Sequence, residues 1–386
     1  MSNARRYLLW GVAALGVPVL FIALTLSINH RGQITDAIRV GRLFYDRPGV
    51  ADLTRRARPS PRSEFGFDGQ FFYFQTFDPL LRRVAAWQAL DAPHLRARRI
   101  GYPLLARLLA QARRRIPMGL LAAQLLGLAA ILAMIQIACR ERGWSPLHGF
   151  LLAASLPVLV PIEYMTCETV AAAWVMAAFF FHERGRSGAC WSCVAAACLT
   201  KEICVLAAFG LMLDMASRGR WKRAAVYAAS LLPLAAWIAY LRWRIPVDPS
   251  LAGDLRNLDW PLAGALDACV ADWRAWLAGE RPANQLVRAL GIAWFVGGAA
   301  IAWIRLARGP SAAAWCAAGA GCLAVLLTNT PVRNYEYILN YGRQLALLPA
   351  ALAADYFFAS RPESPRSRRV MTAWLAAGLA LGLFWA

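Results

Sequence analysis

The sequence predicts an all-α protein that crosses a membrane many times. Of its 386 residues, 59% are hydrophobic and 16 are tryptophan, and the mean hydropathy is +0.43. Soluble domains of this length do not have such a composition. The first apolar run, residues 7–28, spans about 33 Å as a helix, which is enough to cross a bilayer core. It is too long for the core of a signal peptide, so we interpret it as a retained signal anchor.

Ten further apolar stretches follow, so we expect eleven spans. They lie at 118–139, 147–161, 168–181, 188–200, 203–217, 224–241, 286–305, 312–329, 343–359 and 370–386. Several have only about 12–15 residues, which leaves counts from nine to twelve open. The short connectors between alternate spans are rich in arginine and would all lie on one side with Arg5 and Arg6. By the positive-inside rule that side is the cytoplasm, with the N-terminus inside and the C-terminus outside.

Two long segments, 29–117 and 242–285, would then face outward. The first carries 17 arginines against seven acidic residues, about half of the net charge of +20. It is too long for the positive-inside rule to apply. Within it, residues 79–90 and 99–112 have apolar positions at helical spacing among arginines, which predicts two amphipathic helices on the membrane surface. The second loop contains Trp260, Trp273 and Trp276 in an amphipathic pattern, and we treat the whole chain, 1–386, as one transmembrane domain.

Several charged residues fall at the outer ends of the expected spans. They are Glu163, Glu168, Lys201, Glu202 and Arg343. A charge inside the bilayer costs at least about 2.5–3.5 kcal/mol on insertion scales, so such residues need partners or a function. Structural roles remain open for each: Lys201 and Glu202 as an ion pair between short helices, Glu163 and Glu168 at a helix start, and Arg343 as an interfacial anchor.

Residues 65–74, which read FGFDGQFFYF, place Asp68 between glycines and aromatic residues. Gly66 and Gly69 permit a tight turn and the close approach of another molecule. The aromatic rings suit either a membrane interface or stacking on a sugar ring. The alternative is that Asp68 only caps the aromatic helix that follows it.

Acids, an arginine and a lysine at one membrane surface suit a reaction on a lipid-linked phosphate. The cations would hold phosphate oxygens, and a carboxylate would take a proton from an attacking hydroxyl. An anionic headgroup would also be attracted to the arginine-rich first loop. By contrast, Cys190 and Cys193 have the spacing of a redox motif but open a membrane segment without the βαβ pattern that such motifs accompany.

The same stretches resemble a known family. A long outer loop after the first span, with an acidic residue and two surface helices, is similar to the GT-C superfamily of membrane glycosyltransferases, which use polyprenyl-phosphate-linked sugars. The order FDGQFFY (67–73), DPL (78–80) and RIGYPLL (99–105) resembles a bacterial GT-C-like group that reads YDGQFYY, DP and RILYPLLA. Later, ET (168–169), LTKE (199–202) and RQLALLP (343–349) are similar to that group's TEP, LTRE and RxLLP stretches. The resemblance is collinear over about residues 65–350.

The resemblance implies that Asp68 is the catalytic base and that Lys201 and Arg343 neutralise the donor phosphate. The remaining motif positions and outer charges would support the site: Gln70, Tyr73, Asp78, Arg99, Tyr102, Glu163, Glu168 and Glu202. Many GT-C enzymes have two adjacent acids where this chain has Asp68 and Gly69. One carboxylate is a poor divalent-metal site without water and phosphate ligands, so a divalent metal is not favoured but stays open, and the sequence identifies no cofactor. Lys201 stands where the group has arginine, which keeps the charge but loses the bidentate fork.

We therefore expect a glycosyltransferase that moves a sugar from a polyprenyl-phosphate donor to a glycan, lipid or protein acceptor. Its place would be the bacterial inner membrane, with the active site facing the periplasm, membrane lipids around it and no nucleic acid among its partners. The alternatives are a transporter or flippase for a lipid-linked saccharide and a non-catalytic component of an envelope-polysaccharide machine. An enzyme requires charges at one face, whereas a transporter requires them at mid-membrane or at both faces.

Overall fold

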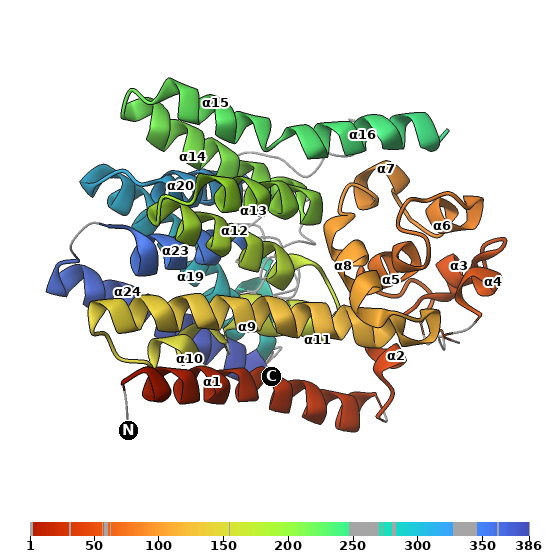
Figure 1. The fold of residues 1–386 in the computed structure, drawn as a ribbon. Helices are drawn as coiled ribbons and strands as arrows, with labels where there is room; N and C mark the ends of the chain where they lie inside the picture. The colour runs from red at the N-terminus through yellow and green to blue at the C-terminus, as the bar shows by residue number, and fades with distance from the viewer. Residues whose placement is uncertain are drawn as a thin grey trace.

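The computed structural model describes residues 3–30, 32–55, 57, 61, 63–153, 155–246, 270–271, 273–279, 283–326, 346–360 and 363–385. Within these ranges the chain is 79% helix and contains no strand (Figure 1). This confirms the expected all-α class.

The first third of the chain consists of two long helices with a group of short helices between them. They are α1 (Asn3–Asn29), α2 (Ile34–Ala37), α3 (Arg42–Tyr45), α4 (Val50–Thr54), α5 (Gly69–Phe77), α6 (Val84–Gln88), α7 (Pro93–Arg96), α8 (Gly101–Ala110), the 3-10 turn η1 (Arg113–Arg115) and α9 (Ile116–Arg142). The short helices gather on one side of the molecule, on the right in Figure 1. We call residues 34–110 the cap.

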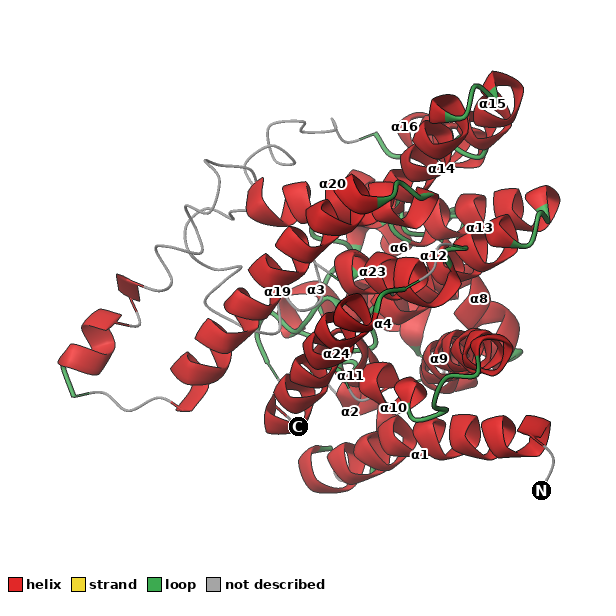
Figure 2. Cartoon of the chain, turned by 90° about the vertical axis from the view of Figure 1, so that its left-hand side faces the viewer, coloured by secondary structure: helices red, strands yellow, loops and turns green. Residues whose placement is uncertain are grey.

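The rest of the chain forms the helical bundle. Its described helices are α10 (His148–Ala153), α11 (Leu156–Glu163), α12 (Glu168–Glu183), α13 (Ser187–Thr200), the 3-10 turn η2 (Glu202–Cys204), α14 (Val205–Ser217), α15 (Trp221–Ala229), α16 (Leu232–Arg244), α19 (Ala283–Arg308), α20 (Ala312–Leu326), α23 (Leu347–Phe358) and α24 (Pro365–Trp385). Figure 2 shows α1 on one outer side of this bundle and α15 with α16 on the opposite side.

Four described stretches are long and apolar enough to cross a membrane: Ala4–Asn29, Arg113–Arg142, Trp221–Arg244 and Ala289–Arg308. Three shorter helices, Ser187–Thr200, Ala312–Leu323 and Leu347–Phe358, are also apolar. The chain is therefore an α-helical membrane protein, while the expected count of eleven spans is not confirmed.

Prolines divide two of the expected spans. The expected span 147–161 consists of α10 and α11, and α11 has Pro157 in its first turn. The expected span 224–241 consists of α15 and α16, with Pro233 in the first turn of α16. Proline lacks the amide hydrogen that a helix interior needs but fits a first turn, so a new helix begins at each.

The two amphipathic helices expected in the first loop are shorter than predicted. Only residues 84–88 of the stretch 79–90 are helical. The preceding residues form a turn, because Leu81 has a φ of 52°. The Asp78 carboxylate holds this turn by accepting a hydrogen bond of 2.7 Å from the amide of Arg83. The stretch 99–112 forms α8 and ends at Gln111, whose φ of 56° cannot continue a helix. In the second loop, Trp273 and Trp276 are exposed, and Trp260 lies outside the described residues.

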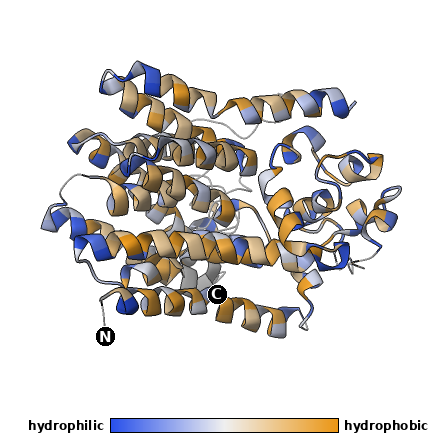
Figure 3. Ribbon diagram, viewed as in Figure 1, coloured by the Kyte–Doolittle hydropathy of each residue, from blue (hydrophilic) through white to orange (hydrophobic). Residues whose placement is uncertain are grey.

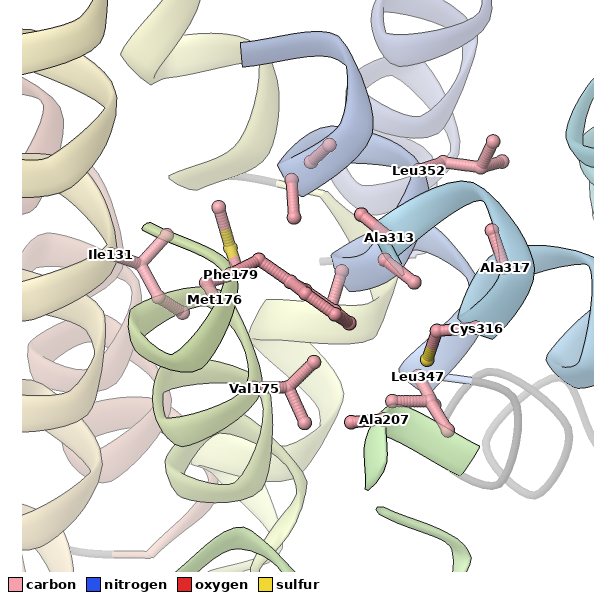
Figure 4. Packing of buried hydrophobic residues seen from close by; sticks show 14 of the residues in the cluster. Ile131, Val175, Met176, Phe179, Ala207, Ala313, Cys316, Ala317, Leu347 and Leu352 are labelled. Carbon is pink, nitrogen blue, oxygen red and sulfur yellow. The ribbon is translucent and has the colours of Figure 1, made fainter. Parts of the chain in front are cut away.

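The buried apolar side chains form two main cores. The larger lies between α9, α12, α14, α20 and α23, where Phe179 packs near Ile131, Met176 and Ala313 (Figure 4). The smaller joins the cap to the start of α9 and contains the aromatic residues of α5. Hydrophobic residues run along the long helices, whereas more polar residues gather near their ends (Figure 3). The cap thus has its own core and sits at one end of the bundle.

Side-chain contacts define the opposite end of the bundle. Arg142, at the end of α9, donates hydrogen bonds to the carbonyl oxygens of Tyr356 and Ala359, and Arg184 pairs with Glu141. Three of the expected basic connectors therefore meet at one end, which we call the Arg142 end. The cap lies at the other, the Asp68 end, and the 16 residues of α12 separate the two by about 24 Å.

Candidate functional site

The chain reaches Asp68 through a turn that depends on two glycines. Gly66 has a φ of 70°, which other residues rarely adopt. A Cβ on Gly69 would lie 2.2 Å from the carbonyl oxygen of Tyr164, so only glycine fits where the cap meets the bundle. The buried Gln70 side chain hydrogen bonds to backbone groups of the two adjoining loop segments. These contacts fix the start of α5 against the bundle.

Asp68 forms an ion pair with Arg96. The distance from Arg96 Nη1 to Asp68 Oδ2 is 2.9 Å, and the Asp68 side chain is 21% exposed. Arg96 also donates two hydrogen bonds to Asp91, and its guanidinium lies 4.7 Å from the ring centre of Phe71. Asp68 is the N-cap residue of α5, but its side chain makes no capping hydrogen bond to that helix and pairs with Arg96 instead. Burial opposes the charge of Arg96, but Asp68 and Asp91 outweigh it and raise its pKa.

Arg99 joins the cap to the turn between α13 and α14. Its Nε donates a hydrogen bond of 2.8 Å to Glu202 Oε2, and its Nη2 donates to the other carboxylate oxygen. The backbones approach closely here, because a Cβ on Gly101 would lie 2.4 Å from Thr200 Oγ1. A bidentate arginine–carboxylate pair is among the strongest and most directional ion pairs in proteins.

Lys201 and Glu168 form a buried ion pair between α12 and the end of α13. Lys201 Nζ lies 2.9 Å from Glu168 Oε1, and the two side chains are 9% and 3% exposed. Glu168 stands in the first turn of α12, where the helix dipole favours a negative charge. A lysine at this depth is stable only with such a partner.

A further pair connects the cap to the end of α11. Arg39 donates a hydrogen bond of 3.0 Å to Glu163, and its guanidinium lies 4.3 Å from the ring centre of Tyr164. Glu163 is therefore at the end of a helix, not at the helix start that the sequence left open.

The first three pairs form one continuous group. Arg96 and Arg99 influence each other electrostatically, and Arg99 also interacts with Glu168. We call this group the outer charged cluster; its members are Asp68, Arg96, Arg99, Glu168, Lys201 and Glu202. Asp68, Glu168, Lys201 and Glu202, which the sequence placed at one face, all belong to this group of ion pairs. Their convergence with Arg343 on one cavity stays a prediction, because Arg343 lies outside the described residues.

The other motif residues have structural contacts. Tyr102 is fully buried and donates a hydrogen bond of 3.1 Å to the carbonyl oxygen of Leu120 in α9. Tyr73 is fully buried in the cap core, and burial raises the pKa of its phenol. Asp78 shapes the turn after α5. These residues, like Gln70, hold the cap together rather than face a ligand.

The aromatic residues of α5 are unavailable for stacking on a sugar. Every residue of α5 is buried, including Phe71, Phe72 and Phe74. Before the helix, Phe67 packs on Tyr164 with a distance of 4.2 Å between ring centres, and Phe65 is 63% exposed. The expectation of an aromatic binding surface is therefore wrong for α5, whose rings form a core instead.

Sequence reasoning missed Arg96, Arg39 and Asp91. All three lie in the first loop, where 17 arginines offered no sign of which ones are paired. The weak signal for Arg96 was its position three residues before Arg99, which begins the segment 99–105 that resembles the GT-C-like group. Arg39 had no such signal, because its partner Glu163 is 124 residues away.

The Arg142 end also holds buried charges, so they are not confined to one end as expected. Asp214 is 1% exposed, accepts a 2.8 Å hydrogen bond from Arg218 and lies 3.4 Å from His182 Nε2. Asp355 is fully buried and pairs with Arg305. Each of these carboxylates stands in the last turns of a helix, close to the basic connectors.

Among the described residues, no group of three or more histidine, cysteine, aspartate or glutamate side chains could hold a metal ion. The features of the candidate site on which we rely are therefore its ion pairs. Cys190 and Cys193 are free and buried in α13.

The Gly69 contact gives a first prediction. Replacing Gly69 with alanine should destabilise the protein by about 1–3 kcal/mol, because the added methyl group overlaps the carbonyl oxygen of Tyr164. The matched control is Gly188→Ala in α13, where no atom lies within 4 Å and alanine favours the helix. Thermal unfolding in detergent measures both. Equal stability of the two variants would contradict the close approach of cap and bundle.

The Glu202 carboxylate gives a second prediction. Burial alone would raise its pKa, but the charge and hydrogen bonds of Arg99, with smaller contributions from its own backbone amide and Lys201, lower it to about 2. Because the folded-state pKa is below the unfolded value, the pair stabilises the protein above about pH 4.5, and this stabilisation is lost as the pH falls toward 2. Relative to Glu202→Gln, the wild type should lose on the order of 3 kcal/mol over this interval.

Denaturation at a series of pH values measures the difference. Glu64→Gln, which removes an exposed carboxylate from the first loop, is the control and should follow the wild-type curve. A Glu202→Gln curve parallel to the wild type would contradict the lowered pKa.

Comparisons with protein-family models, curated proteins and solved structures found no match to this chain.

Proposed function

We propose that the protein is a glycosyltransferase of the GT-C kind, which transfers a sugar from a polyprenyl-phosphate donor at the Asp68 end. The observation that supports this most is the outer charged cluster. It pairs the partly exposed Asp68 carboxylate with Arg96 and continues through the pairs of Arg99 and Lys201, where an apolar bundle meets its cap. This is the set of groups that a reaction between a hydroxyl and a phosphate-linked sugar requires.

In the proposed reaction, Asp68 accepts the proton of the acceptor hydroxyl. The hydroxyl oxygen forms a bond to the anomeric carbon of the sugar while the bond from that carbon to the phosphate oxygen breaks. Polyprenyl phosphate leaves, and the anomeric configuration inverts. Arg96 fixes the direction of the carboxylate, because it is itself held by Asp91.

The cations would neutralise charge on the leaving phosphate. Arg96 and Arg99 are the nearest to Asp68 along the cluster. Each guanidinium has five N–H donors, which is more than its carboxylate partners accept, so each can also donate to a phosphate oxygen. Lys201 is farther into the bundle and is paired with Glu168, so we assign it to positioning the end of α13 rather than to direct phosphate contact. Arg343 retains the phosphate-binding role that the family resemblance implies.

We further propose that the Asp68 end faces the periplasm of a bacterial inner membrane, with the N-terminus in the cytoplasm. The basic connectors at the Arg142 end support this orientation through the positive-inside rule. Single cysteines at the exposed positions Phe65 and Arg220 test it, in a background with the nine native cysteines replaced. A membrane-impermeant maleimide should label the first and not the second in intact cells; the reverse would overturn the orientation.

The runner-up is a transporter of lipid-linked saccharides, and the buried charges at both ends favour it. Asp214 and Asp355 lie at the end opposite Asp68. Between the two ends, however, the described core consists mainly of apolar side chains from α9, α12, α14, α20 and α23. We therefore prefer the glycosyltransferase to the transporter.

The decisive experiment uses the purified full-length chain in proteoliposomes. Radiolabelled monosaccharides on polyprenyl phosphate are supplied singly, with a bacterial glycan extract as acceptor. Release of polyprenyl phosphate coupled to labelled glycan supports transfer. Movement of the intact lipid-linked sugar between leaflets, detected by an impermeant oxidant and without release of phosphate, would establish the transporter instead. Asp68→Asn proteoliposomes are the control for transfer.

A further inference from the structure

The Arg142 end contains a cavity that the proposed transfer reaction does not use. Its volume is about 720 Å³, and it lies between the loop after α9 and the first half of α24. Three rings line it, those of Trp144, His148 and Tyr356, and we call them its floor; Thr372, Ala373 and Ala376 of α24 line it as well. The cavity lies at the end of α9 opposite the cap, which packs on the start of that helix.

The aromatic floor is held rigidly. The ring centres of Trp144 and Tyr356 are 4.8 Å apart, and His148 lies 5.9 Å from Trp144. The carbonyl oxygen of Trp144 accepts a hydrogen bond of 2.7 Å from the hydroxyl of Tyr7 in α1, and Arg142 lies over its indole ring. The floor therefore links α1, α9 and α23.

The rim of the cavity is cationic. Arg368 and Arg369, near the start of α24, line it and are exposed, while no aspartate or glutamate lines it. Neither guanidinium forms an ion pair or a side-chain hydrogen bond with any described residue, in contrast to Arg142, Arg184 and Arg305 at the same end. Two unneutralised arginines beside Ser145 and Thr372 hydroxyls are suited to an anion with several oxygen acceptors.

The position of the cavity identifies the anion. Trp and Tyr side chains near arginines that have no acidic partner, at the ends of apolar helices, are typical of the headgroup level of a bilayer. From the rim, Ala373 and Ala376 give α24 a small apolar wall along which an acyl chain can lie. We propose that this cavity binds the phosphate headgroup of an anionic phospholipid, with one acyl chain along α24, and that the bound lipid fastens α24 to the loop after α9.

The site is tested by titrating the purified full-length protein in neutral detergent with dioleoylphosphatidylglycerol. Binding is followed by native mass spectrometry and by the rise in the unfolding temperature. Arg368→Gln with Arg369→Gln should weaken binding by about fivefold per arginine. Both residues are exposed, so this double variant should fold normally without lipid.

The matched control is the double variant Arg308→Gln with Arg366→Gln. It removes the same charge from exposed positions at the same end that do not line the cavity, and it should bind like the wild type. Dioleoylphosphatidylcholine, which has no net charge, should bind at least tenfold more weakly. Equal weakening in both double variants, or no weakening in either, would overturn the site. Displacement of the phospholipid by soluble glycerol phosphate at equal concentration would identify a water-soluble phosphate as the ligand and overturn the assignment to lipid.

Discussion

Replacing Asp68 with asparagine is expected to lower the rate of sugar transfer by about 10²–10⁴ while the protein remains folded. Asparagine keeps the size of aspartate and still accepts a hydrogen bond from Arg96, but it cannot take a proton from the acceptor hydroxyl. The lost ion pair is partly exposed, so its removal should cost only about 1 kcal/mol of stability. Donor binding should change little, because the phosphate is held by the cations.

The control for this variant is Asp91→Asn, which touches the same arginine. Asp91 accepts two hydrogen bonds from Arg96 and is more exposed than Asp68. If Asp68 acted only by orienting Arg96, the two substitutions would reduce transfer by similar factors. We expect Asp91→Asn to retain activity within about tenfold and Asp68→Asn to lose it. Full transfer by Asp68→Asn would end its assignment as the base.

Much of the helical architecture could be predicted from the sequence, because its causes are local. Apolar runs and basic connectors fix where helices begin and end, and α9, α12 and α13 start within two residues of the expected spans. The breaks at Pro157 and Pro233 were missed, although each proline marks the start of a helix. The number of spans depends on how each short helix sits in lipid, which hydropathy alone does not decide.

The charged cluster could be predicted only in part. Lys201, Glu168, Glu202 and Arg99 were identifiable, because each interrupts an apolar stretch or belongs to a motif. Their pairing is a tertiary property, and no spacing rule connects Arg99 with Glu202 across 103 residues. The expectation that the aromatic residues of α5 form a binding surface was wrong for a different reason. Apolar residues cover nearly every side of that helix, so the sequence could not show that the cap would bury them all.

The largest effect on stability is expected from Lys201→Met, at about 3–5 kcal/mol. Methionine fills nearly the same volume, but its introduction leaves Glu168 as a buried carboxylate without its cation. The matched control is Lys222→Met, the other lysine of the chain, which is exposed and should change stability by less than about 0.5 kcal/mol.

A double-mutant cycle separates a positioning role of Lys201 from a role in binding phosphate. If Lys201 mainly neutralises Glu168, then Lys201→Met combined with Glu168→Gln should recover most of the lost stability, because a buried amide costs far less than a buried charge. Donor binding should recover with it, since the end of α13 and its Arg99–Glu202 contact would be restored. If Lys201 binds phosphate directly, stability should still recover in the double variant, but donor affinity should stay low. Stability is read from thermal unfolding in detergent, and affinity from titration with a polyprenyl phosphate. Our assignment of Lys201 to positioning stands only if the two quantities recover together.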